Sequence, residues 1–308
     1  MTKKVFIVSL SVVVFAFASL TPALYAENLT VNYLEGILKV QSPSGWREIF
    51  IGDTVSDSAM VRLEGLGSDP IAELDGKGGT PKITLSSAGT YQLKELLAAS
   101  GNLASTGIGS LIMGKMQPML LKSKVQEQGV VGGVRGDVVT EQVSFYDTEE
   151  LVKTGKELFE KGNYYEALKA LDEAASFAME EEQPEIRFYQ GLIHTVQGNN
   201  GKALDALADV KQDPEDEFYA ALVLLKAQLL VESFAYQKAI TWLEEFENRS
   251  VNSGKYREAL QSAYLLSGLS YREIKNTGQA KEHLIKSISL NPDSETAKAA
   301  SSLLATLK

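Results

Sequence analysis

Residues 161–167 read Lys161-Gly162-Asn163-Tyr164-Tyr165-Glu166-Ala167, and this stretch decides how the second half of the chain is interpreted. A helical pattern ends at the glycine, an aromatic residue follows two positions later, and an alanine comes three positions after that. Related patterns return near Gly198, Phe234 and Lys275, so the spacing is 36 residues twice and then 41. Self-similarity with a period of about 20–50 residues is typical of stacked helical hairpins, which present an interaction surface.

The composition excludes several classes of function. The chain has 308 residues, 40 acidic against 30 basic, and a formal net charge of −10. This negative field disfavours nucleic acid and unassisted binding to anionic lipid. There is no cysteine, which rules out disulfides, thiol nucleophiles and thiolate metal sites. At roughly 100–200 residues per domain, the length predicts two domains.

The first 26 residues have the pattern of a secretory signal peptide. Lys3 and Lys4 precede an uncharged, apolar run over residues 5–20, and Pro22 and small residues follow. We expect cleavage after Ala26, with cleavage after Ala23 as the second choice and an uncleaved membrane anchor as the alternative. The chain is therefore predicted to be exported, to the bacterial periplasm.

Residues 27–146 are predicted to form a β-rich module. Short apolar runs are separated by glycine or proline, which is typical of a small sandwich or barrel. Leu34, Gly36, Leu38 and Val40 are expected on one face of a single extended strand. Residues 93–124 are expected to form a weak, interrupted helix packed on this module, because Pro118 limits helix length.

Several motifs in this module occur in a fixed order. They are Gly36-x-Leu38-x-Val40, Trp46, Gly52-Asp53-x-Val55, Ala59-x-Val61-x-Leu63 and, much later, Val130-Val131-Gly132-Gly133-Val134-Arg135-Gly136-Asp137. Together they resemble a FecR-type domain over about residues 30–140, with the closing Val-Arg-Gly element as the most specific part. The loop at residues 65–70 and Asp137 depart from the family pattern. The resemblance implies an extracytoplasmic β module that contacts other components of the cell envelope.

Two residues of this module have both a functional and a structural interpretation. The Arg135 guanidinium suits an anion, but a pairing with a carboxylate inside the domain is favoured. Trp46 could stack on a sugar or a peptide, but a place in the core is favoured because large aromatic residues dominate cores.

The helical half follows a 34-residue unit. With Gly162 at position fifteen, Gly155, Tyr164, Ala167 and Leu171 occupy the large and small packing positions. Small residues are needed there because two helices approach closely only where one side chain is short. The pattern resembles tetratricopeptide (TPR) repeats, with four units over about residues 148–292 and a capping helix behind them. The predicted fold is therefore α+β in two domains, with the FecR-like module over 27–146 and an all-α TPR solenoid over 147–308.

The first helices of the four units would line the inner surface of such an array. The residues predicted there are Val152, Lys156, Phe159, Phe188, Leu192, Leu224, Gln228, Val231, Leu265, Leu269 and Arg272. The Lys, Arg and Asn set by which chaperone-binding TPR proteins hold a carboxylate is missing. The groove is predicted to be apolar with an acidic fringe, which suits a hydrophobic peptide or helix. The alternative is that the β module or another copy of the chain fills it.

Nothing in the sequence argues for catalysis. No phosphate-binding glycine loop, nucleophile elbow or His-Glu metal motif is present, and the two histidines, His194 and His283, fall in different helical units. No cofactor or metal is expected. The leading hypothesis is a periplasmic, non-enzymatic adaptor or scaffold that binds envelope proteins or peptides through the groove and the FecR-like module. The alternative is a protein that binds peptidoglycan or another carbohydrate through the β module.

Overall fold

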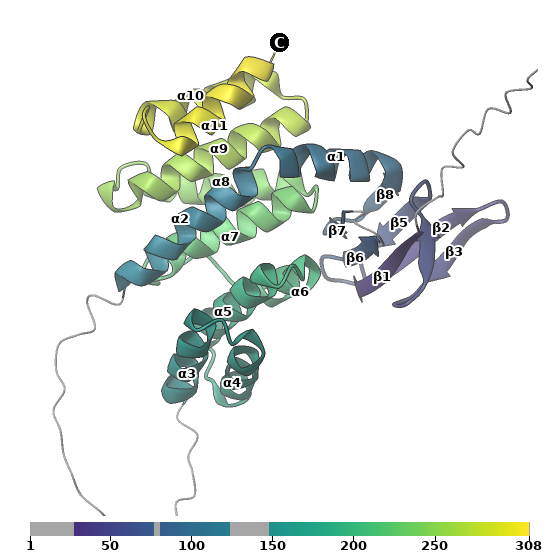
Figure 1. The fold of residues 1–308 in the computed structure, drawn as a ribbon, viewed down its shortest axis with the longest axis horizontal. Helices are drawn as coiled ribbons and strands as arrows, with labels where there is room; N and C mark the ends of the chain where they lie inside the picture. Colours follow the sequence, from purple (N-terminus) through teal and green to yellow (C-terminus); the bar gives the residue numbers. More distant parts are fainter. Residues whose placement is uncertain (1–27, 77–80, 124–147, 308) are drawn as a thin grey trace, which may run out of the picture.

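The computed structural model describes residues 28–76, 81–123 and 148–307. Strands come first and helices follow, so the predicted α+β class in two parts is confirmed (Figure 1). The predicted signal peptide, the 130–137 element with Arg135, and the boundary after residue 146 lie outside the described residues.

The β module consists of two antiparallel four-stranded sheets. Their orders are β4-β1-β6-β7 and β3-β2-β5-β8. The strands are β1 (Asn28–Glu35), β2 (Ile37–Ser42), β3 (Gly45–Ile49), β4 (Thr54–Ser56), β5 (Met60–Glu64), β6 (Ile71–Gly76), β7 (Ile83–Leu85) and β8 (Gly89–Gln92). Both sheets contribute to one buried cluster, which includes Leu29, Val31 and Leu74 from the first and Leu38 and Val61 from the second. The predicted small sandwich is therefore present.

Gly36 is the point at which the chain changes sheets. Its φ of +104° lies in the left-handed region, and a Cβ on it would sit 2.5 Å from the Glu64 carbonyl oxygen. Only glycine tolerates both conditions. The prediction of one strand through Leu34 and Val40 is thus wrong, because β1 and β2 belong to different sheets.

Trp46 lies on the outside of the sandwich. Its side chain is half-buried and is absent from the sandwich core. The guanidinium of Arg62 on β5 stacks 4.2 Å from the centre of its ring, a cation–π contact that reaches across β2 within one sheet. The expectation that Trp46 fills the core is wrong, because β3 is an edge strand with Trp46 on its outer side.

The helical part is a series of pairs followed by a last helix. The helices are α3 (Thr148–Glu160), α4 (Tyr164–Phe177), α5 (Gln183–Val196), α6 (Asn200–Ala206), α7 (Tyr219–Glu232), α8 (Tyr236–Ser250), α9 (Arg257–Glu273), α10 (Thr277–Leu290) and α11 (Glu295–Thr306). We call α3, α5, α7 and α9 the A helices, and their partners α4, α6, α8 and α10 the B helices. Helix α11 packs on α9 and α10 and caps the array, as predicted (Figure 1).

The repeated sequence signature forms the same turn in every pair. Gly162, Gly198, Phe234 and Lys275 all have φ between +60° and +77°. In each turn the next residue donates its N–H to the carbonyl five positions earlier, as Asn163 does to Leu158 at 2.9 Å. This is the Schellman end of a helix, which favours glycine because a left-handed residue with a Cβ is strained.

Small residues stand where A and B helices cross. A Cβ on Gly155, Gly191 or Gly268 would lie 2.6–2.8 Å from the Cγ of a leucine, which is on the partner helix for Gly155 and Gly268 and is the residue directly after α6 for Gly191. The leucines occupy the space that a larger residue would need, so each pair packs closely. The predicted role of Gly155 is confirmed.

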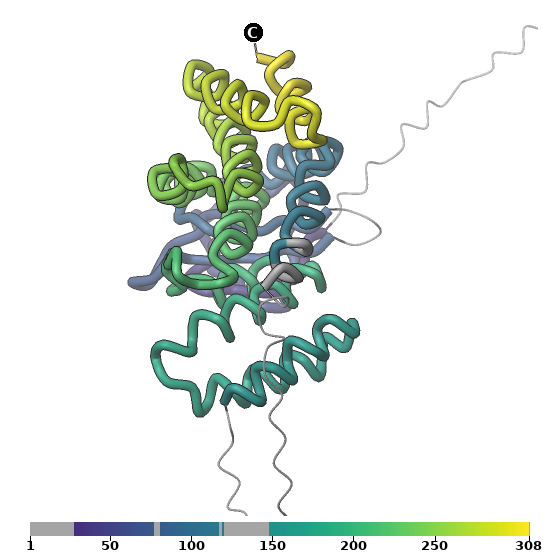
Figure 2. Tube along the Cα trace, turned by 90° about the vertical axis from the view of Figure 1, so that its left-hand side faces the viewer, coloured from purple at the N-terminus to yellow at the C-terminus, as the bar shows by residue number. Residues whose placement is uncertain are grey.

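The second pair is shorter than the others. Helix α6 has 7 residues, and residues 207–218 connect it to α7 without a helix. In Figure 2 the segment from α3 to α6 and the segment from α7 to α11 form two groups. The rings of Phe188 and Phe218 stack 4.9 Å apart and join the groups at their core.

Two more helices link the β module to the array. Helix α1 (Leu93–Ser105) and helix α2 (Ile108–Ser123) meet at Gly107, whose φ is +67°. The expected interruption is therefore at Gly107, and α2 continues through Pro118. The predicted packing is wrong for α2, since Ile108, Ile112 and Met116 are buried in the core of the helical array. That packing offsets an interior proline, which costs a helix roughly 3 kcal/mol.

A membrane-spanning helix is not found singly among the described residues. Helix α1 and the first part of α2, bent by 56°, have together the length and composition of a broken span.

Candidate protein-binding surfaces

The eleven residues predicted to line a groove all lie on A helices. We call the surface that these residues were predicted to line the inner face. Eight of them are buried, and Phe188, Leu224, Leu265 and Leu269 are fully buried. Lys156, Phe159 and Arg272 are half-buried. The inner face is thus covered over much of its length by other parts of the same chain.

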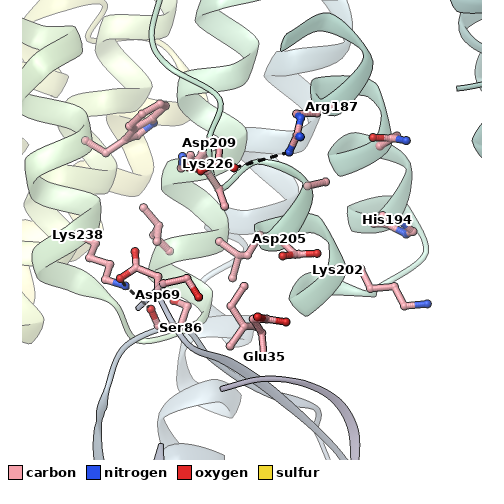
Figure 3. A pocket seen from close by; sticks show the side chains of 18 of the residues that line it. Glu35, Asp69, Ser86, Arg187, His194, Lys202, Asp205, Asp209, Lys226 and Lys238 are labelled. Atoms are coloured by element: carbon pink, nitrogen blue, oxygen red, sulfur yellow. Dashed lines mark hydrogen bonds and ion pairs between the residues drawn. The ribbon is translucent and has the colours of Figure 1, made fainter. Parts of the chain in front are cut away.

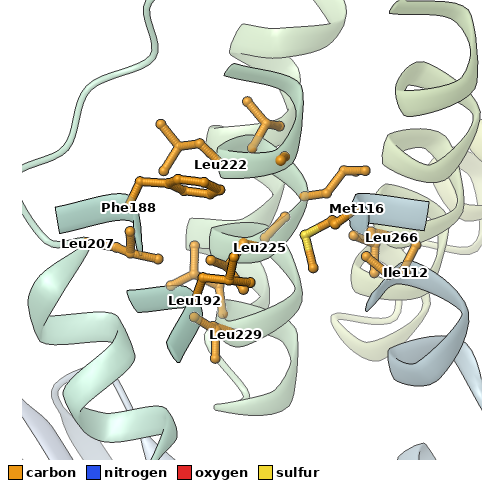
Figure 4. Close-up of a cluster of buried hydrophobic side chains, with 14 of the residues drawn as sticks. Ile112, Met116, Phe188, Leu192, Leu207, Leu222, Leu225, Leu229 and Leu266 are labelled. Atoms are coloured by element: carbon orange, nitrogen blue, oxygen red, sulfur yellow. The ribbon is translucent and has the colours of Figure 1, made fainter. Parts of the chain in front are cut away.

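Helix α2 covers part of α7 and also reaches α9. It packs along α7 and also touches α11 (Figures 1 and 2). Ile108, Ile112 and Met116 recur every fourth residue and form one apolar stripe. They lie in the same buried cluster as Leu225 of α7 and Leu266 of α9 (Figure 4). In the part of the chain that the structure describes, α2 and not the β sandwich occupies this place.

Two contacts show the direction in which α2 runs. Near its start, a Cβ on Gly109 would lie 2.8 Å from the Glu232 carboxylate at the end of α7. Further along, the Lys115 ammonium lies 2.9 Å from the Glu258 carboxylate at the start of α9. Helix α2 therefore runs antiparallel to the A helices.

Glu232 connects three elements at one end of this contact. Its carboxylate accepts hydrogen bonds from Gln228 at 2.9 Å and from Asn200, at the start of α6, at 3.1 Å. Burial raises the pKa of the Glu232 carboxyl, while these two hydrogen bonds oppose the shift. The close approach of Gly109 brings α2 to the same carboxylate.

The β module contacts the turns of the second pair. The buried Glu73 carboxylate on β6 accepts a hydrogen bond of 2.8 Å from the Gly201 N–H, in the first turn of α6. Its other oxygen accepts from Lys82 at 2.9 Å, and Lys82 also donates to the Gly198 carbonyl at 2.7 Å. A Cβ on Gly201 would lie 2.9 Å from the Tyr33 ring, so the two parts meet closely.

A second contact joins the β module to the third pair. The Ser86 and Ser233 hydroxyls lie 2.6 Å apart. Lys238 donates to the Ser86 carbonyl at 2.6 Å and pairs with Asp69 at 2.9 Å. Phe234, the left-handed residue of this turn, packs against the sandwich core. The signature turns of the second and third pairs are therefore docking points as well as helix ends.

A cavity of about 1130 Å³ lies between these two contacts (Figure 3). Its Lys226 ammonium donates to the carbonyls of Leu207 and Ala208 at 2.6 and 3.1 Å and lies 4.4 Å from the Trp242 ring. Burial lowers the pKa of Lys226 to about 8. These partners satisfy the amine, so its role is to close the C-terminal end of α6.

Two ion pairs form between charged groups that line the cavity. Arg187 lies 4.0 Å from Asp209, and Lys238 pairs with Asp69. In Figure 3, Lys202 and Arg187 lie apart from each other rather than around a common point. Among the described residues that line the cavity, we therefore find no set of charges that converges on a small ligand.

The histidines remain apart, as the sequence predicted. His283 Nε2 lies 3.3 Å from the Glu247 carboxylate, which accepts a 2.6 Å hydrogen bond from Ser267. The hydroxyl points to the carboxylate and not to the imidazole, and all three groups are buried. They form a structural network between α8, α9 and α10, without the nucleophile–base contact of an acyl-transfer site. Among the described residues, no group of three or more His, Asp and Glu is placed to hold a metal.

Sequence reasoning missed Glu73, Gly109 and Lys115. A signal for Glu73 was present, because Ile71, Ala72 and Leu74 around it form a run buried on both faces, where a charge needs a partner. Gly109 and Lys115 had no such signal, since their partners are more than one hundred residues away in the chain.

Paired helices, repeated Schellman turns and glycine crossings define a TPR-type helical repeat protein, a class that binds proteins or peptides. Within that class, the chain belongs to the family described as "T7SS, ESX-1 secretion system protein EccA1, N-terminal domain", whose sequence profile matches residues 149–303.

Solved structures, several of them of TPR proteins, are similar over about half of the chain. A TPR protein from Parabacteroides merdae is 19% identical over 52% of this chain and 59% of its own length, less than two thirds, with a TM-score of 0.44. Pseudomonas aeruginosa pilF is 19% identical over 51% of this chain and 68% of its own, with a TM-score of 0.41. A TPR protein from Thermus thermophilus is 16% identical over 52% and 82%, with a TM-score of 0.37. No curated protein matches the chain.

Proposed function

We propose that this protein is a non-enzymatic scaffold of the cell envelope that binds partner proteins through the inner face of its TPR-type array. The observation that carries the proposal is the seat of α2. Its apolar stripe is buried against α7 and lies in the same cluster as Leu266 of α9, so this surface accepts an apolar helix. Binding of an amphipathic helix in a hydrophobic groove is a common mode of peptide recognition.

The proposed location outside the cytoplasm rests on residues 1–26, which have the charge and hydropathy pattern of a signal peptide. The FecR-like sequence pattern of residues 30–140 supports the same compartment. The β sandwich would then contact other envelope components while it is docked on the second and third helix pairs. The family's description names a secretion system, which is a setting in which a scaffold of this kind would serve.

Photo-cross-linking in cells tests the scaffold function. Benzoylphenylalanine replaces Phe159, a half-buried aromatic residue at the exposed part of the inner face. The control position is Tyr165, which is 76% exposed on α4. We expect one defined protein adduct at position 159 and none at position 165. Equal labelling at both positions, or no adduct at position 159, would contradict binding through the inner face.

Cell fractionation with N-terminal sequencing tests the location. We expect the protein in the periplasmic fraction, with Glu27 as its first residue, or Leu24 if cleavage follows Ala23. A cytoplasmic protein that keeps residues 1–26 would contradict the proposed compartment.

A further inference from the structure

We propose that α2 is an internal ligand of the partner site, and that the partner is an apolar helix with a small residue followed six positions later by a basic one. The inference rests on the proposed function and names the partner's chemistry. It is carried by the contacts of α2 with α7 and α9.

Helix α2 is a poor helix by itself. Gly109, Gly114 and Pro118 lie inside it, and its first turn has no acidic residue. Glycine and proline are the two weakest helix formers, so this segment depends on the inner face for its helical state. A segment that must be ordered by its binding surface binds with a lower net affinity than one that is already helical. A more stable helix with the same contact residues can therefore replace α2.

The inner face accepts only a small residue at one point of the contact with α2. A Cβ on Gly109 would lie 2.8 Å from the Glu232 Oε1 atom and 3.3 Å from the Gln228 Nε2 atom. Both groups are held in place by hydrogen bonds, to each other and to Asn200. A large side chain at this position would break that network, so a competing helix needs glycine or another small residue here.

The charge of α2 is opposite to that of the residues around its contact. Helix α2 contains lysines and no acidic residue, and Lys115 meets Glu258 at 2.9 Å. Glu232 lies at the other end of the same contact. An acidic helix would bring like charges to both places. A basic residue six positions after the small one satisfies Glu258, and apolar residues at the positions of Ile108, Ile112 and Met116 fill the core.

A partner helix has to compete with α2 for the same surface. Because α2 is tethered to its own binding surface, its effective concentration there is on the order of millimolar. A free helix must overcome this concentration in the intact chain. Weakening α2 should therefore open the site without altering any residue of the surface itself.

The test uses the chain from Glu27 onward and a fluorescent synthetic peptide of residues 107–123. Fluorescence polarisation compares the unchanged chain with Ile112→Ser/Met116→Ser, which removes two apolar contacts of α2. We expect the variant to bind the peptide at least tenfold more tightly. Circular dichroism checks that the variant is folded. If it is not, Gly109→Leu in the chain replaces it as the variant that weakens the contact of α2.

Two altered peptides test the recognition rule. The Gly109→Leu and Lys115→Glu peptides should each bind the opened variant at least tenfold more weakly than the native peptide. Equal binding of all three peptides, or equal affinity of the unchanged chain and the variant, would overturn the proposal. If no peptide binds while cross-links still form at position 159, α2 is a structural helix and the scaffold function stands without it.

Discussion

At the scale of single residues, the left-handed turn position shows how local strain is distributed. Two of the four turns have glycine, and two have Phe234 and Lys275 with φ of 60° and 65°. A residue with a Cβ in this region costs roughly 1–2 kcal/mol. Phe234 gains a contact with the sandwich core in return, whereas Lys275 is exposed.

Substitution by glycine should therefore have opposite effects at these two turns. Lys275→Gly relieves strain and loses no buried contact, so we expect about 1 kcal/mol of added stability. Phe234→Gly also loses its packing on the sandwich, worth about 1.5–3 kcal/mol, so the net effect should be destabilising. Urea unfolding at one pH measures both changes, and a gain of stability in both variants would contradict the assigned role of Phe234.

The two histidines should give opposite pH dependences of stability. Burial disfavours a charged His283, but its hydrogen bonds to Glu247 and to the Gln279 carbonyl outweigh burial and raise its pKa. Its contribution is then fully present below the unfolded value of about 6.5 and is lost as the pH rises through the folded-state pKa. Burial lowers the pKa of His194, so the folded state holds this imidazole neutral. The protein therefore loses stability at this residue as the pH falls below the unfolded value.

The measurement is the free energy of unfolding in urea between pH 5.5 and 8.5. Removing the second histidine with His194→Gln leaves His283 as the remaining imidazole. The difference between His194→Gln and His194→Gln/Glu247→Gln should be largest at low pH and shrink as the pH rises. A difference that is constant with pH would show that Glu247 does not stabilise a charged His283.

At the scale of elements, the helix pairs depend on crossings that only small residues allow. Gly268 of α9 is the closest case, with Leu284 Cγ 2.6 Å from the position of a Cβ. Helix α6 shows the opposite adaptation. It is only 7 residues long, and Lys226 from α7 binds the carbonyls that its end leaves free.

A larger residue at the α9–α10 crossing should separate the two helices. We expect Gly268→Leu to lower stability by about 3 kcal/mol, because a packed core tolerates added volume poorly. The matched control is Gly278→Ala in α10, where the nearest atom is 3.9 Å from the Cβ position. That change should raise stability by about 0.5 kcal/mol, since alanine favours a helix over glycine. Thermal unfolding followed by circular dichroism distinguishes the two outcomes, and equal effects would contradict the crossing geometry.

At the scale of the whole molecule, the sandwich core and the core of the helical array are joined by a small number of polar contacts, together with the apolar contact of Phe234. Glu73 joins the sandwich to α6, and Lys238 joins it to α8 through Asp69 and Ser86. Helix α2, which follows the sandwich in the chain, packs on the inner face of the array and forms a further connection between the two parts. A charge as buried as Glu73 stabilises only while its partners remain, and removing one partner of such a pair costs about 3–5 kcal/mol.

Breaking both polar contacts should uncouple the two cores. Calorimetry of the unchanged chain should show one unfolding transition, and Glu73→Ala/Lys238→Ala should show two. The control is Lys39→Ala/Glu64→Ala, an ion pair of 2.7 Å within the sandwich, which should keep one transition. A single transition in both variants would show that the polar contacts do not couple the cores.

The sequence by itself determined the paired helices, the positions of their turns and the class of the β module. These features follow from interactions between near neighbours in the chain, such as Gly162 at a left-handed turn and the small residue Gly155 one helix away from Leu171. Alternating apolar residues likewise placed most strands, although the change of sheet at Gly36 was not foreseen.

Only the tertiary structure decided what covers the inner face and where the β module docks. Helix α2 contains glycine and proline that argue against a helix, and its seat depends on Glu232 and Glu258, far away in sequence. Glu73 similarly finds its partner in Gly201 across the two parts. Burial of a charge or of a weak helix depends on surfaces that form only when distant segments meet, and local sequence patterns do not contain that information.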